Sequence, residues 1–126
     1  MTEPDALERQ HTLATATARY DDLRMRDALA DGTDGGLSRE EALELLALGE
    51  VVARKAAYGR QAMVRTARSR GASWTQIGAA LGSSKQAAWE SYSRWIDEQA
   101  RRHERTGYEG LDPKQVNEAR GLGGPL

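Results

Sequence analysis

The sequence predicts an all-α fold, a helical bundle whose N-terminal helices are long. Three observations favour this class. Long stretches carry little or no glycine or proline, apolar residues recur three and four positions apart, and Ser-X-X-Glu or Ser-X-X-Gln patterns precede apolar runs. Four main helices are therefore expected, near residues 5–30, 38–69, 73–80 and 84–104.

The first expected helix begins after Pro4, a residue that suits the first turn of a helix. It continues to about Ala30 without an internal glycine or proline. Its apolar stripe is thin and rich in alanine, and it fits packing on the rest of the domain or on a partner helix. His11 is interpreted as a surface histidine rather than a metal ligand. The stripe consists of Leu13, Ala16, Tyr20 and Leu23, with Leu7 and Ala30 nearby in phase.

Residues 31–36 (Asp-Gly-Thr-Asp-Gly-Gly) predict a turn that acts as a hinge between helices. The glycines are not followed by the Gly-Lys-Ser or Gly-Lys-Thr of a phosphate-binding loop. The carboxylates also lack the spacing of a calcium loop.

The second expected helix begins at Ser38, which forms a capping-box pattern with Glu41. Its acidic start and basic end suit the helix macrodipole. Gly59 is expected to weaken or bend it, and Arg70-Gly71 to end it. Its apolar face is expected to comprise Ala42, Leu45, Leu46, Val52, Ala56, Met63 and Ala67.

A short helix is expected next, because Ser73 and Gln76 form a second capping-box pattern. Ile77 and Leu81 lie four residues apart on one face, so both are expected to be buried. Gly82 ends this helix, since glycine adopts the left-handed conformation without strain.

The following helix restarts at Ser83 or Ser84, and the spacing leaves that register open by one residue. Ser83 and Gln86 make a further capping-box pattern. The helix then continues to about Glu104. Its aromatic residues Trp89, Tyr92 and Trp95 have a spacing more typical of a core or a subunit interface than of a ligand site.

Residues 77–88 resemble the helix-turn-helix of bacterial transcription regulators and the promoter-reading module of sigma factors. In that family a small residue four positions before the turn glycine lets the two helices touch, and Gly78 stands four positions before Gly82. An apolar residue six positions after the glycine closes the core. Ala88 occupies that place; it is smaller than the usual Val or Ile, and Tyr92 would supply the missing volume. The resemblance covers about 25 of the 126 residues.

The resemblance implies that the second helix of the motif enters the major groove by its N-terminal end. Gln86 would then pair with adenine, and Lys85 would reach guanine or a phosphate. Burial against a neighbouring helix is an equally good interpretation of Trp89. The residues assigned to DNA are Thr75, Gln76, Ser83, Ser84, Lys85, Gln86, Trp89 and Glu90, flanked by Arg65, Arg68 and Arg70.

Charge is uneven along the chain, although the formal net charge is only −1. Residues 1–37 carry a net charge of −4 and residues 38–70 a net charge of +3. No acidic residue lies between Val51 and Trp89. Such a basic run is usually a solvated helix face. Here it leads directly into the motif, where phosphate contacts are needed, and this placement favours nucleic-acid binding.

The expected organisation has three parts: an N-terminal helix and hinge (1–36), a DNA-binding domain with a long scaffold helix (37–105), and a flexible tail (106–126). The last segment carries five Gly and two Pro, with a short helix expected at Pro113–Ala119. The start of the chain, Met1–Asp5, is acidic and precedes no long apolar run. A cytoplasmic protein at the nucleoid, without a membrane span, is therefore expected.

The composition argues against an enzyme. The chain has no cysteine, and its two histidines are isolated, so no thiolate or metal site is expected. No cofactor motif is present either. The leading hypothesis is a sequence-specific DNA-binding regulator that acts as a homodimer, since one helix-turn-helix has a small footprint. A module that docks on the transcription machinery and a non-specific nucleoid-associated DNA binder are the alternatives.

Overall fold

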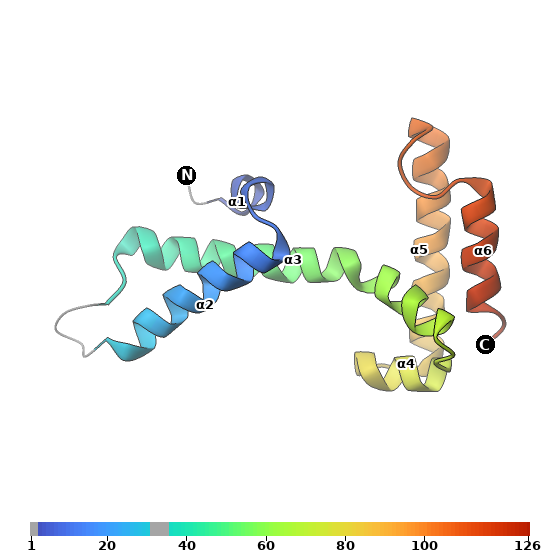
Figure 1. Ribbon diagram of the computed structural model, residues 1–126, viewed down its shortest axis with the longest axis horizontal. Helices are drawn as coiled ribbons and strands as arrows, with labels where there is room; N and C mark the ends of the chain where they lie inside the picture. The colour runs from blue at the N-terminus through green and yellow to red at the C-terminus, as the bar shows by residue number, and fades with distance from the viewer. Residues whose placement is uncertain (1–2, 31–35) are drawn as a thin grey trace. The chain divides into compact units, whose positions relative to one another are not determined.

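The computed structural model describes residues 3–30 and 36–126, and every regular element in those residues is a helix, as the sequence predicts (Figure 1). The chain divides into two compact units, Met1–Gly59 and Arg60–Leu126. The division falls inside the third helix. The helices are α1 (Pro4–Gln10), α2 (Leu13–Leu29), α3 (Arg39–Ser69), α4 (Trp74–Leu81), α5 (Lys85–Thr106) and α6 (Pro113–Gly123).

The single N-terminal helix expected over residues 5–30 is wrong, because the chain leaves the helical conformation at His11 and Thr12. Thr12 caps α2: its side chain accepts from the Thr15 backbone N–H at 3.2 Å, and the Thr15 hydroxyl accepts from the Thr12 N–H at 3.0 Å. Threonine competes well for backbone groups in this way, which favours a cap over a helix interior. The hinge expected at residues 31–36 lies almost wholly outside the described residues.

In the first unit, α2 pairs with the N-terminal part of α3 in an antiparallel manner. Arg19 binds Glu44 at 3.0 Å through two guanidinium nitrogens, and Arg26 binds Glu41 at 2.6 Å. The hydrogen bond from Arg19 lowers the pKa of Glu44. The capping box between Ser38 and Glu41 is confirmed. The core of this unit is formed by Leu7, Ala16, Leu23, Ala47, Leu48 and Val51.

The apolar face expected on α3 is largely wrong. Leu46 and Met63 are 70% and 63% exposed, whereas Leu48 and Val51 are fully buried. Apolar residues occupy several sides of this helix, so periodicity alone does not select the buried side. Of the expected residues, Leu45, Val52 and Ala67 pack against the two cores as partly buried neighbours.

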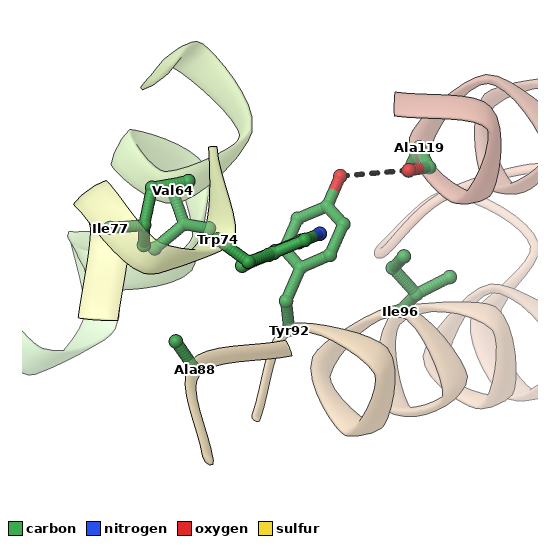
Figure 2. Packing of buried hydrophobic residues seen from close by; sticks show 7 residues of the cluster. All are labelled: Val64, Trp74, Ile77, Ala88, Tyr92, Ile96 and Ala119. Atoms are coloured by element: carbon green, nitrogen blue, oxygen red, sulfur yellow. Dashed lines mark hydrogen bonds between the residues drawn. The ribbon is translucent and has the colours of Figure 1, made fainter. Parts of the chain in front are cut away.

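The second unit is built around Tyr92 of α5 (Figure 2). Its ring lies beside that of Trp74, with the centroids 5.5 Å apart, and stacks on Trp95 at 5.9 Å. The Tyr92 hydroxyl donates to the Ala119 carbonyl of α6 at 2.9 Å. Burial raises the pKa of the Tyr92 phenol. The core of this unit consists of Val64, Trp74, Ile77, Ala88, Tyr92, Ile96 and Ala119.

The C-terminal segment forms α6, which packs antiparallel alongside α5 instead of extending as a tail (Figure 1). The helix expected at Pro113–Ala119 is present and continues to Gly123. Asp112 caps it, in a capping box with Gln115. The glycine-rich composition was misinterpreted: a Cβ at Gly110 would meet the backbone of α5, so this glycine permits close packing.

Within the described residues, no helix combines the length and apolar character needed to cross a membrane.

Candidate nucleic-acid interface

A short turn of three residues, Gly82–Ser84, joins α4 to α5, and α4 lies across the start of α5 (Figure 1). Gly82 adopts a left-handed conformation with φ of 68°, as expected. The Gly82 and Ser83 amides donate to the carbonyls of Ala79 and Gly78, which satisfies two of the carbonyls in the last turn of α4. Gly82 therefore provides the sharp end of α4 that the sequence predicts.

Gly78 is buried against the turn. A Cβ at this position would lie 2.9 Å from the Ser83 carbonyl oxygen and 3.0 Å from the Lys85 nitrogen. These neighbours are backbone atoms, so they cannot move aside without displacing the start of α5. The small residue four positions before Gly82 thus has the close-packing role that the sequence predicts.

The caps of α4 and α5 differ. Ser73 and Gln76 form the expected capping box, so the Gln76 amide donates to the Ser73 side chain rather than being free for phosphate. Ser84 caps α5 by accepting from the Ala87 amide at 3.0 Å, which resolves the register in favour of Ser84 over Ser83. Lys85 and Gln86 occupy the first turn of α5, where backbone amides point outward from the helix.

The predicted contact residues separate into two groups by exposure. The residues at the helix starts and the turn are exposed, whereas Arg65, Arg68, Trp89 and Glu90 are half-buried. Gln86 donates to the Glu90 carboxylate at 3.0 Å along the same helix face. The exposed residues are Thr75, Gln76, Ser83, Ser84, Lys85, Gln86 and Arg70.

Two arginines border this exposed surface. Arg70 lines a hollow together with Gln76 at the start of α4. Arg60 lines another hollow with Ser83 at the turn. Arg60 was not among the predicted contacts, although it lies in the stretch between Val51 and Trp89 that has no acidic residue. Its position on α3 beside the turn depends on packing, which the local pattern does not reveal.

Arg68 differs from the expectation that it flanks the surface as a free cation. Its guanidinium donates to the carbonyls of Leu122, Gly123 and Ala72 at 2.7, 3.2 and 3.0 Å. It also lies over the Trp74 ring, 5.1 Å from the centroid. With its donors engaged by backbone, Arg68 serves the packing of the second unit rather than a phosphate.

Two other predicted contacts also have partners inside the protein. The Arg65 guanidinium lies 3.9 Å from the Glu118 carboxylate. Trp89 donates its indole N–H to the Gly124 carbonyl at 2.9 Å and packs against the core. Both contacts favour burial against a neighbouring helix over a DNA contact as the interpretation of Trp89.

The two units carry opposite charge. Residues 1–59 contain seven basic and twelve acidic residues, a net charge of −5, and residues 60–126 contain eleven basic and seven acidic residues, a net charge of +4. The unit that holds the candidate interface is therefore the basic one. In the described part of the chain, no three His, Asp or Glu side chains gather where they could hold a metal ion.

No protein-family model, curated protein or solved structure matches this chain.

Proposed function

We propose that this chain is a sequence-specific DNA-binding protein, a transcription regulator whose α4 and α5 form a helix-turn-helix. The observation that supports this most strongly is the exposed polar start of α5, Ser84 to Gln86, directly after a glycine turn packed against Gly78. In a helix-turn-helix, this end of the second helix enters the major groove.

Electrostatics support the same assignment. From Arg60 to Trp89 the chain has five basic residues and no acidic one, and the unit that contains them is net positive. Lys85 is exposed at the start of α5, and the exposed Arg60 and Arg70 line hollows beside the turn and the start of α4, so these three are the cations available to phosphates there.

Base recognition is assigned to Gln86 and Lys85. A glutamine amide pairs with the N6 and N7 groups of adenine, and a lysine reaches guanine or a phosphate. In the free protein the Gln86 amide is held by Glu90 at 3.0 Å. The Gln86 side-chain amide has two N–H donors, so one can stay on Glu90 and orient the amide while the other donates to N7 of adenine.

A homodimer accompanies this proposal, because a single helix-turn-helix covers few base pairs and tight binding normally combines two. Selection of bound sequences from a random DNA pool tests both parts. A palindromic site is the expected result. A single half-site would argue against the dimer, and recovery of no preferred sequence would favour a non-specific DNA binder.

A protein-interaction module is the second candidate, and the first unit favours it. That unit is net negative and leaves Met25, Leu29 and Leu46 between 56% and 78% exposed. Such a surface suits a protein partner such as the transcription machinery better than DNA. If the selection recovers nothing and binding to duplex DNA is absent, this candidate replaces the first.

A further inference from the structure

The end of α6 receives hydrogen bonds from three different helices. The Leu122 carbonyl accepts from Arg68 of α3 at 2.7 Å, and the Gly123 carbonyl accepts from Trp74 of α4 at 2.8 Å. The Gly124 carbonyl accepts from Trp89 of α5 at 2.9 Å. Three consecutive carbonyls, Leu122–Gly124, thus connect α3, α4 and α5; we call this segment the carbonyl clamp.

The clamp depends on its two glycines. A Cβ at Gly123 would lie 3.1 Å from the ring of Tyr92, a side chain only 1% exposed and therefore unable to move away easily. Gly124 has φ of 61° and ψ of −171°, a combination that is essentially restricted to glycine. The close approach and the backbone conformation together aim successive carbonyls at the two indoles and the guanidinium.

We propose that the carbonyl clamp sets the position of α4 against α5, which makes Trp74 and Trp89 positioning residues for DNA recognition. This inference rests on the proposed function. Trp74 is the first residue of α4, and Trp89 lies one turn after Lys85 on α5. The clamp therefore holds both helices near the ends that carry the exposed polar residues.

The length of α4 explains why such positioning is needed. With eight residues, α4 is too short to be stable alone and takes its orientation from its packing. Apolar contacts are non-directional, whereas an indole N–H donates along one direction to one acceptor. The hydrogen bonds to Gly123 and Gly124 therefore fix the orientation of α4 relative to α5 more closely than the apolar core contacts do.

Replacing tryptophan by phenylalanine separates the hydrogen bond from the packing. Trp89→Phe keeps an aromatic ring but removes the indole donor to the Gly124 carbonyl. Trp74→Phe removes the indole donor to the Gly123 carbonyl, which keeps its second donor, Arg68. Trp95→Phe is the matched control. Trp95 is half-buried on α5 and stacks on Tyr92, but its indole makes no hydrogen bond in the described residues.

The first measurement needs no DNA. In the full-length protein, amide hydrogen exchange in α4 is followed by NMR for the parent and the three variants. Trp89→Phe and Trp74→Phe are expected to accelerate exchange of the α4 amides roughly tenfold, as loss of a buried bond would. Trp95→Phe is expected to leave the α4 amides within roughly twofold of the parent. If Trp74→Phe does not fold, Trp89→Phe still tests whether the clamp positions α4, because Trp89 is only half-buried.

The second measurement compares affinity for the selected duplex and a scrambled one, at a temperature where circular dichroism shows every variant folded. Trp89→Phe is expected to lose roughly tenfold on the selected duplex and little on the scrambled one, because misplaced helices lose base contacts before phosphate contacts. Trp95→Phe should retain the discrimination of the parent.

The outcomes separate the two proposals. If Trp89→Phe and Trp95→Phe match in both exchange and discrimination, the clamp only adds packing and this inference is overturned. If the parent binds no DNA, the proposed function fails and the exchange rates alone decide whether the clamp positions α4. If the parent discriminates but Trp89→Phe discriminates equally well, DNA recognition stands and the positioning role falls.

Discussion

Single glycines inside helices have opposite roles in this chain. A Cβ at Gly59 would have no neighbour within 4 Å, whereas one at Gly78 would meet backbone at 2.9 Å. Gly59→Ala is therefore expected to stabilise the protein by about 0.5–1 kcal/mol, the cost of glycine in a helix. Gly78→Ala is expected to destabilise it by about 1–3 kcal/mol, because the turn must shift.

Urea unfolding of both variants measures this difference. Equal effects of the two substitutions, or a stable Gly78→Ala, would contradict the close approach of α4 to the turn.

Ile77 and Leu81 were both expected to be buried, but only Ile77 is, at 4% exposed, whereas Leu81 is 40% exposed. Leu81 is the last residue of α4, and its neighbours in the adjacent hollow include Ala80 and Ala87, which are too small to cover it. Ile77→Ala should cost about 2–5 kcal/mol, as core truncations do, and Leu81→Ala only about 1 kcal/mol. Thermal melts of the two variants check the order, and a larger loss for Leu81→Ala would refute it.

At the residue scale, the features predicted correctly are those that depend only on residues close together in sequence. The capping boxes at Ser38 and Ser73 and the left-handed Gly82 are local, and all three are present. Two of the three carbonyls that accept from Arg68, and the carbonyl that accepts from Trp89, lie more than thirty residues away in sequence. Their engagement was not predictable, because an arginine in a basic run has the same local pattern whether it binds phosphate or backbone.

Between elements, Tyr92 links α5 to α6 through its hydroxyl and its buried ring. Burial, the largest effect, raises the pKa of this phenol, while the charges of Arg65 and Arg68 lower it. The folded state therefore favours the neutral phenol. Its contribution to stability is complete below the unfolded pKa of about 10 and is lost as pH rises through the higher folded pKa.

Tyr92→Phe is expected to cost about 1–2 kcal/mol at pH 8, because the Ala119 carbonyl loses a donor. Between pH 8 and 11 the variant should lose less stability than the parent, since it has no phenol to ionise. Urea unfolding at several pH values measures both effects. Identical pH profiles would mean that Tyr92 ionises as freely in the folded as in the unfolded protein.

Element boundaries followed the sequence where a strong stop or start signal exists. The ends of α3 and α4 were predicted because Gly71 and Gly82 both adopt positive φ there. The break between α1 and α2 was missed, since Thr12 is a weaker signal than a glycine or proline. The packing of α6 was missed because glycine content alone does not distinguish a segment that packs closely from a segment that is mobile.

At the scale of the whole molecule, the distribution of charge separates the two units more clearly than the total does. A net charge of −1 conceals one unit of −5 and another of +4. The basic unit also holds the exposed starts of α4 and α5. The proposed assignment of DNA contacts to this unit leaves the acidic unit for contacts with proteins, including a second copy of the chain.

Variants within the basic unit should divide into two kinds. Gln86→Ala is expected to cost about 1–3 kcal/mol on the selected duplex only, since it removes a base contact. Arg70→Ala is expected to weaken binding to all duplexes alike and to flatten the salt dependence by about one unit. Arg70 is a better choice for this test than Arg68, because Arg68→Ala would also disturb packing. Fluorescence titration on selected and scrambled duplexes distinguishes these patterns, and equal losses for Gln86→Ala on both would exclude base reading by Gln86.

The salt dependence of the unmodified protein shows whether the second unit binds DNA. Its affinity for duplex DNA is measured by fluorescence titration at several salt concentrations. With Arg60, Arg70 and Lys85 as the phosphate contacts, the logarithm of the association constant should fall linearly with the logarithm of salt, with a slope of roughly −3 per protomer. Absence of binding, or an affinity that does not change with salt, would mean that the second unit does not bind the phosphates of DNA.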